Sequence, residues 1–251
     1  MTHVCHRWRD VALAAPTLWP SISISVHDKP FPSSEAMAVW LGRTGKALLS
    51  AEVWGHDFWS QRATSPVREL LSSFIIEQLP RMREFDLSTP RELPSSFEWP
   101  PSVYPCLDSL YLDSETPTWE PKVDSISLRR DFSRHFPALK KLTLKNYHQF
   151  DFQTWTLPPT LTHLEIQNYM FTLTSALPNV LEVLRRLRSL SKLSLLDTFS
   201  HDSDLPGNLE AVELPLLQSL TLRGRMDDNK LLLDHLQSPP FARLLSELEA
   251  G

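Results

Sequence analysis

Glycine is scarce in this chain, which has six glycines against 21 prolines in 251 residues. A shortage of glycine leaves few tight hairpin turns and few loops that could cradle a phosphate. None of the motifs G-x-S-x-G, G-x-x-x-x-G-K-[ST], G-x-G-x-x-G or H-E-x-x-H occurs. We therefore expect no enzymatic activity and no cofactor, and the many prolines predict fixed connections between elements.

Cysteine is also scarce, and Cys5 and Cys106 form neither a metal-binding spacing nor a disulfide framework. Such low cysteine usage is typical of a reducing compartment, so we expect a cytoplasmic or nuclear protein. No apolar run is long enough to span a membrane, and the first ten residues lack the apolar core of a signal peptide. The net charge of −5, without clustered Lys and Arg, argues against a nucleic-acid partner.

Apolar residues are plentiful, at 41% of the chain with eight Trp and twelve Phe, so a sizeable core is expected. Many of them follow the pattern L-x-x-L-x-L, with conservative substitutions, which recurs seven times at intervals of 22 to 34 residues. These intervals are near the 20–29 residues of leucine-rich repeats. The seven segments are Leu48–Val53, Met82–Leu87, Leu107–Leu112, Leu139–Leu144, Leu161–Ile166, Leu190–Leu195 and Leu217–Leu222, and an eighth, Leu245–Ala250, is cut off by the chain end.

The fold follows from this pattern. Its fourth and sixth positions fall on one face of a short strand, so both point into a core, while the residues between them point outward. One repeat cannot bury its apolar edge alone, so neighbours stack. We predict an α/β leucine-rich-repeat-like solenoid over residues 21–251, with short parallel strands on the concave side, helices and loops on the convex side, and an incomplete last repeat. An ordinary α/β domain with parallel strands is the alternative.

Return segments and turns can also be predicted. Cap residues and apolar stripes indicate helices at residues 65–79, Glu35–Gly42, Pro178–Leu187 and Asn229–Leu236, and residues 113–137 read as an irregular connection with one helical turn near Phe132. Small polar residues or glycine just past a strand can turn the chain. The residues at these positions are Ser88, Ser114, Asn146, Asn168, Asp197 and Gly224.

The N-terminal segment has a pattern of its own. Cys5, Trp8 and Ala12 share one helical face, Pro16 stops the helix, and the strand-like run SISIS follows at Ser21–Ser25. The segment VCHRWRDVA, followed by PTLW and SISIS, resembles the C-terminal half of an F-box in fungal F-box-like proteins with divergent leucine-rich repeats. Similar segments of that family match WLGRTG at residues 40–45, LLS at 48–50 and LQSPPF at 236–241, so the resemblance covers most of the chain.

The resemblance implies a function. Members of this family bind the small adaptor subunit of cullin–RING ubiquitin ligases and recruit substrate proteins to it. Residues 1–20 correspond to the second half of the motif, and its upstream "LP-x-E" helix and second helix are missing, which we interpret as truncation. The resemblance thus implies a substrate-recruiting adaptor with a truncated F-box. The alternative is a free-standing leucine-rich-repeat scaffold with no ligase role.

Two sets of candidate site residues follow. A repeat array needs a covered end, so we expect the N-terminal apolar residues to cap the solenoid, with adaptor binding as the alternative role. These residues are Val4, Trp8, Leu13, Leu18 and Trp19.

The second set is the concave face, which solenoids use to bind proteins. It is acidic early and basic later, so it either orients a partner of opposite charge order or is a soluble surface of mixed charge. We expect a monomer with protein partners. The face comprises Glu52, Trp54, Glu84, Asp86, Tyr111, Asp113, Lys141, Lys145, His163, Glu165, Lys192 and Arg223.

Other groups of polar residues give weaker evidence for a functional site. His3, Cys5 and His6 have no matching second cluster, so we expect no metal site. His201, Asp202 and Asp204 lie in a stretch rich in Ser, Asp, Pro and Gly that reads as a solvated loop, and the residues at 56–57 read as a turn. A hydrolase would rest on these scattered His and Asp residues alone.

Overall fold

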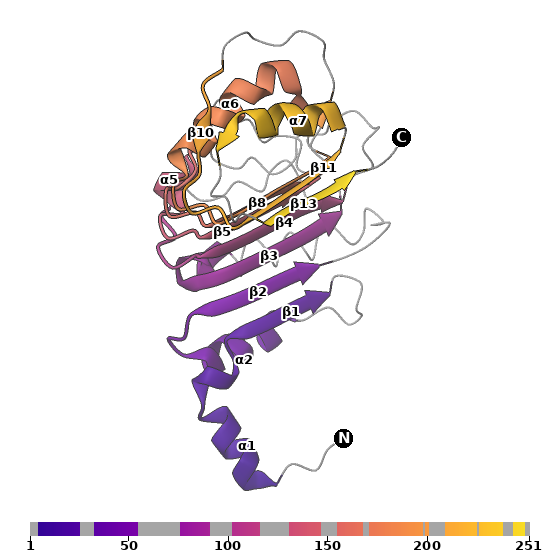
Figure 1. Cartoon of the computed structure of the whole chain (residues 1–251). Helices are drawn as coiled ribbons and strands as arrows, with labels where there is room; N and C mark the ends of the chain where they lie inside the picture. The colour runs from indigo at the N-terminus through magenta and orange to yellow at the C-terminus, as the bar shows by residue number, and fades with distance from the viewer. Residues whose placement is uncertain are drawn as a thin grey trace.

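The computed structural model describes eleven stretches of the chain: residues 5–25, 33–54, 76–90, 102–115, 131–146, 155–167, 171–197, 199–200, 209–224, 226–237 and 243–248. They form a mixed α/β structure around one nine-stranded sheet (Figure 1). The strands are β1 (Ser21–Ser25), β2 (Leu49–Trp54), β3 (Met82–Pro90), β4 (Ser109–Glu115), β5 (Lys141–Lys145), β6 (His163–Gln167), β8 (Lys192–Leu196), β11 (Ser219–Gly224) and β13 (Arg243–Leu248).

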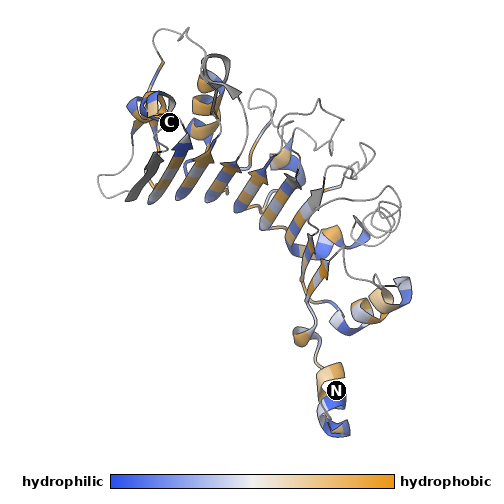
Figure 2. Ribbon diagram, turned by 90° about the vertical axis from the view of Figure 1, so that its right-hand side faces the viewer, coloured by the Kyte–Doolittle hydropathy of each residue, from blue (hydrophilic) through white to orange (hydrophobic). Residues whose placement is uncertain are grey.

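These nine strands lie side by side in the order in which the chain makes them, and every neighbouring pair is parallel. The predicted parallel sheet is therefore confirmed. Two small parallel pairs accompany it: β7 (Phe171–Thr172) with β9 (Phe199–Ser200), and β10 (Val212–Glu213) with β12 (Leu236–Gln237). Parallel neighbours need a crossover connection between them. The sheet forms an arch, with α5, α6 and α7 on its outer side (Figures 1 and 2).

The helices and 3₁₀ turns are short. They are α1 (His6–Leu13), η1 (Pro16–Leu18), α2 (Ser34–Thr44), α4 (Ile76–Gln78), η3 (Leu79–Arg81), α5 (Phe132–His135), α6 (Leu173–Arg186) and α7 (Met226–Asp234). No helix in these stretches is long and apolar enough to cross a membrane.

The predicted core positions align in two rows across the sheet. The fourth positions of the segments pair with one another from strand to strand, and so do the sixth positions. From β4 to β11 every one of them is at most 2% exposed. The fourth-position row is Leu110, Leu142, Leu164, Leu193 and Leu220, and the sixth-position row is Leu112, Leu144, Ile166, Leu195 and Leu222.

The register departs from the prediction at both ends. Leu48, the predicted first core position, is 46% exposed, and Leu49 is fully buried instead. The cause is a shift between β2 and β3, where Leu49 pairs with Met82 but Ser50 pairs with Glu84, so one residue of β3 has no counterpart. At the other end Leu220 pairs with Leu244, whereas the predicted segment Leu245–Ala250 would have placed Leu248 there.

The turn predictions hold at three positions. Asn146, Asp197 and Gly224 have φ values of 54°, 50° and 134°, in the region that asparagine, aspartate and glycine tolerate best. The prediction is wrong for Ser88 and Ser114, because β3 continues to Pro90 and β4 to Glu115. Asn168 lies outside the described residues.

Most predicted helices are present with shifted ends. α2 begins as expected, and its N-cap Ser33 accepts a hydrogen bond of 3.2 Å from the Ala36 N–H. α5 is the predicted turn at Phe132, and α7 starts three residues before the predicted Asn229. The predicted helix at 65–79 falls mostly outside the described residues.

α6 begins at Leu173, so Pro178 lies inside the helix and not at its first position. A proline inside a helix removes one backbone hydrogen bond. Burial of one helical face against the sheet offsets this cost, because the members of that face join the core. They are Leu177, Val180, Leu181 and Leu184.

Candidate interaction surfaces

Alternating residues of eight strands form a single surface, which we call the polar face and in which Ser25 and Ser194 are buried. Since successive side chains of a strand point to opposite sides, the residues flanking the buried rows all lie on this face, on the inner side of the arch (Figure 2). The three rows, from β1 to β11, are Ser21, Ser50, Glu84, Ser109, Lys141, His163, Lys192 and Ser219; then Ser23, Glu52, Asp86, Tyr111, Thr143, Glu165, Ser194 and Thr221; then Ser25, Trp54, Ser88, Asp113, Lys145, Gln167, Leu196 and Arg223.

All twelve residues predicted for the concave face are in these rows. The rows are also divided by charge. On β1 to β4 they carry four carboxylates and no cation, whereas on β5 to β11 they carry four Lys or Arg residues and one carboxylate, Glu165. Glu165 is 3.9 Å from the Lys145 ammonium, so the basic half is partly neutralised there.

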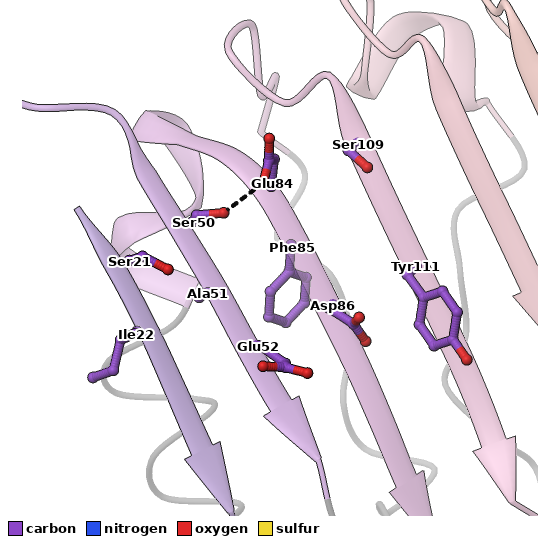
Figure 3. Close-up of a pocket in the computed structure, with 10 residues that line it drawn as sticks. All are labelled: Ser21, Ile22, Ser50, Ala51, Glu52, Glu84, Phe85, Asp86, Ser109 and Tyr111. Atoms are coloured by element: carbon purple, nitrogen blue, oxygen red, sulfur yellow. Dashed lines mark hydrogen bonds between the residues drawn. The ribbon is translucent and has the colours of Figure 1, made fainter.

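The acidic half contains a pocket of about 260 Å³ (Figure 3). Glu52 and Asp86 are register partners on β2 and β3, and neither carboxylate has an ion-pair partner among the described residues. The pocket is lined by Ser21, Ile22, Ser50, Ala51, Glu52, Glu84, Phe85, Asp86, Ser109 and Tyr111.

The carboxylates of the pocket have different environments. Glu84 accepts hydrogen bonds from Arg83 at 2.8 Å and from Ser50 at 2.7 Å, and these bonds lower its pKa. Burial raises the pKa of Asp86 to about 6, with further contributions from the negative charges of Glu52 and Asp113, against the opposing charge of Lys145. The folded protein thus opposes ionisation of Asp86 in the absence of a cation.

The acidic and basic halves meet at Tyr111. Its hydroxyl donates to the Asp113 carboxylate at 3.2 Å, and the Asn146 amide donates to the same carboxylate at 2.8 Å. The Lys145 ammonium lies 5.2 Å from the centre of the Tyr111 ring, a cation–π distance. Burial, followed by the charge of Asp113, raises the Tyr111 pKa, so the phenol is neutral.

In the basic half Lys141, His163 and Lys192 are neighbours on three adjacent strands. Burial lowers the pKa of His163, and the two lysines lower it further, so the imidazole is neutral at pH 7. On the next strand, β11, the Arg223 guanidinium lies 3.4 Å from the carboxylate of Asp197. Among the described residues Lys141 and Lys192 form no ion pair, although the charge of Lys141 helps to lower the pKa of Glu84.

The predicted N-terminal cap is wrong for the residues of α1 and η1. α1 has no buried residue, and Trp8, Leu18 and Leu13 are 68%, 64% and 39% exposed. Figure 1 shows α1 pointing away from the sheet. Two contacts of the half-buried Trp19 connect α1 with α2: its indole N–H donates to the Ala12 carbonyl at 2.7 Å, and the Arg43 guanidinium lies 4.8 Å from its ring. Val4 lies outside the described residues.

Cover at this end of the core comes from α2. Met37 is 2% exposed, and Trp40 and Leu41 pack against the core. Their spacing of three and four residues is the sequence signal that identifies this face. On α1, Val11 is 52% exposed in addition to Trp8, and no described residue buries either side chain.

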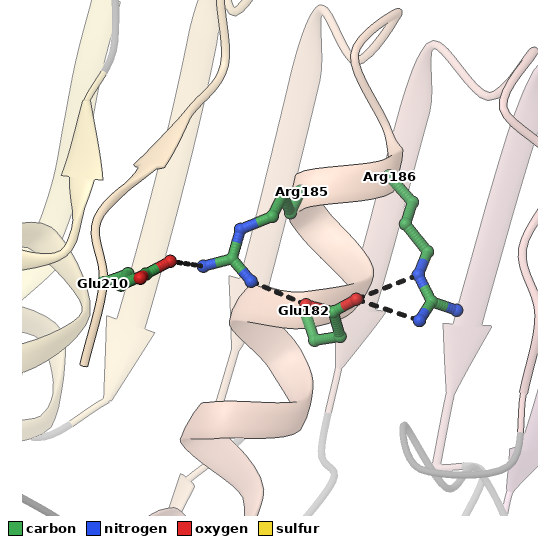
Figure 4. A network of polar contacts seen from close by, with 4 residues as sticks. All are labelled: Glu182, Arg185, Arg186 and Glu210. Atoms are coloured by element: carbon green, nitrogen blue, oxygen red, sulfur yellow. Dashed lines mark hydrogen bonds and ion pairs between the residues drawn. The ribbon is translucent and has the colours of Figure 1, made fainter.

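Of the other candidate groups, only Cys5 and His6 lie in the described stretches, and His3 lies outside them. Cys5 and His6 are exposed, and no group of three metal-ligating side chains occurs in the described stretches. The residues at 56–57, His201, Asp202 and Asp204 lie outside these stretches. The ion pairs of Figure 4 join Glu182 to Arg185 at 2.6 Å and to Arg186 at 2.9 Å, with Glu210 3.6 Å from Arg185. These exposed pairs lie on the helical side of the sheet.

Comparison of the chain with family models, with curated proteins and with solved structures finds no significant match in any of the three. The class of molecule is therefore defined by its own architecture, a parallel sheet with one polar face and one face covered by helices.

Proposed function

We propose that the chain is a leucine-rich-repeat-like solenoid that acts as a non-enzymatic protein-interaction module, of the type that recruits substrates to a cullin–RING ubiquitin ligase. One observation carries the proposal: the strands follow one another in chain order, with the fourth and sixth positions of each segment aligned in two buried rows. Stacked repeats require this arrangement, because each repeat contacts only its neighbours.

The exposure of the apolar side chains of α1 supports a role in adaptor binding rather than in capping the solenoid. Trp8 and Val11 of this helix and Leu18 of η1 are each more than half exposed. Tryptophan is enriched at the centres of protein interfaces, and exposed apolar patches mark interaction sites. This matches the F-box resemblance of the same segment. The two free cysteines suit the cytoplasm or the nucleus, where such ligases would be met.

Isothermal titration with the recombinant adaptor subunit of a cullin–RING ligase tests the proposal. We expect binding by the chain and its loss in the double variant W8A/L18A. The matched control is V103A/L216A, which removes two exposed apolar side chains, 49% and 56% exposed, from the segments before β4 and β11. No binding, either by this chain or by a version extended with the residues encoded upstream, would leave a free-standing scaffold as the function.

A further inference from the structure

We infer that the polar face docks a segment of a partner protein whose charges form two blocks: a Lys or Arg side chain enters the pocket of β1 to β4, and carboxylates lie over Lys141 and Lys192. This inference deepens the proposed function, since it names the chemistry of the partner. It does not depend on binding to a ligase, because α1 lies away from the polar face.

The pocket is suited to an organic cation. Glu52 and Asp86 face each other across neighbouring strands, and like charges in such positions destabilise a sheet. A cation between them would remove this cost and make charge-assisted hydrogen bonds. Ser21, Ser50 and Ser109 add hydroxyl acceptors around the same space.

The size of the pocket favours a side chain over a free metabolite. Its volume of about 260 Å³ lies below the range of roughly 300–1,000 Å³ typical of small-molecule sites. The pocket is also continuous with a face that extends over eight strands and is not covered by any helix of the described stretches (Figure 2). A single cationic side chain projecting from a longer segment fits both features.

The two charged regions set the spacing in the partner. Neighbouring strands are about 4.8 Å apart and Lys141 lies two residues along β5 from the register position of Asp86, so the two residues are roughly 12 Å apart. Lys192 on β8 lies four spacings, or roughly 19 Å, from β3. An extended segment advances about 3.3 Å per residue, so its basic and acidic blocks should be about three to six residues apart.

Charge order also gives the docking its specificity. A segment with alternating charges would place a like charge against one half of the face, which is costly. Tyr111 and Asn146, which hydrogen-bond Asp113 at the boundary, add neutral polar groups between the two halves. The polar face therefore distinguishes partner segments by the order of their charges as well as by their net charge.

Fluorescence anisotropy on the full chain tests this with two labelled peptides of identical composition, RRSTSTEE and RESTREST. At low salt we expect the block peptide to bind about tenfold more tightly, a difference of about 1.4 kcal/mol, and the preference to shrink as salt screens the charges. The double variant E52Q/D86N should lose the preference. The control E210Q/E213Q, which makes the same change in net charge at two exposed positions away from the polar face, should keep it.

Equal binding of the two peptides, including no binding by either, would overturn the inference, and so would an E52Q/D86N variant that keeps the preference. Circular dichroism of E52Q/D86N should show an intact fold, because the substitution removes a repulsion and no packing contact. The adaptor titration with W8A/L18A is independent of these outcomes, so the failure of one proposal can be told from the failure of the other.

Discussion

Glu52 and Asp86 lie directly opposite each other on the parallel strands β2 and β3, with both carboxylates on the polar face (Figure 3). Between them they have no ion-pair partner among the described residues, although Lys145 acts on Asp86 from two strands away. Repulsion of this kind opposes folding and favours the binding of a cation. Where a sequence breaks a rule of sheet pairing in this way, a functional reason is the first to consider.

The first prediction concerns D86N. The pKa of Asp86 is raised in the folded state, to about 6, by burial, Glu52 and Asp113. The folded protein therefore holds this proton more tightly than the unfolded chain, and the free energy of unfolding falls as pH rises from about 4 to about 6. We expect D86N, which lacks this loss, to be more stable than the wild type at pH 7 by about 1 kcal/mol, after allowance for solvent screening at a partly exposed site.

Urea unfolding at pH 4 and at pH 7 measures the effect. The two proteins should differ little at pH 4, where Asp86 is largely protonated in the folded state, and diverge at pH 7. E213Q, a substitution at an exposed residue of β10, should change stability by less than about 0.5 kcal/mol at both pH values. A D86N variant less stable than the wild type at pH 7 would contradict the prediction.

The second prediction uses neighbouring leucines at the start of β2. Leu49 is fully buried and Leu48 is 46% exposed. L49A should lower the free energy of unfolding by about 2–5 kcal/mol, the usual range for a buried leucine that leaves a cavity. L48A should cost less than about 1 kcal/mol. The same chemical change at adjacent positions thus tests the register shift between β2 and β3, and equal costs would place the shift elsewhere.

The leucine spacing predicted the architecture because it contains two periods, one within each segment and one between segments, and both are consistent with stacked parallel strands. The alternation within each segment places Leu142 and Leu144 on one side of a strand, and the recurrence of the segments places each strand beside the next. The shift at Leu49 escaped prediction, since a single-residue bulge leaves the leucine pattern almost unchanged when two leucines are adjacent. The continuation of β3 past Ser88 to Pro90 also depends on pairing with neighbouring strands, which local turn propensity does not capture.

The polar face was predictable for the same reason, since its residues alternate with the buried ones. What the sequence could not indicate was which of its carboxylates converge on a pocket, because that depends on the register between β2 and β3. The position of α1 could not be predicted either. An apolar helical stripe indicates that a helix packs against something, but its partner can be the sheet or another molecule.

The third prediction tests whether the N-terminal helix α1 packs against the sheet or is available to another molecule. W8A should change the midpoint of thermal unfolding by less than about 2 °C, because Trp8 is 68% exposed and its loss opens no cavity. M37A should lower the free energy of unfolding by about 2–5 kcal/mol, because Met37 of α2 is 2% exposed in the core. Scanning calorimetry of both variants measures the contrast, and a strongly destabilised W8A would restore the capping role to α1.

The fourth prediction concerns His163, which shares a row of the polar face with Lys141 and Lys192. Burial lowers the pKa of its imidazole, and the two ammonium groups lower it further by opposing a third positive charge. K141Q/K192Q should therefore raise the pKa of His163, and a partner that places carboxylates over these lysines should raise it as well. Imidazole resonances followed by NMR from pH 5 to 8 measure the change. K46Q/K230Q removes two exposed lysines away from this row and should leave the titration of His163 unmoved. An unchanged titration in K141Q/K192Q would mean that burial alone sets the pKa, and the block peptide could then be sensed only at the acidic pocket.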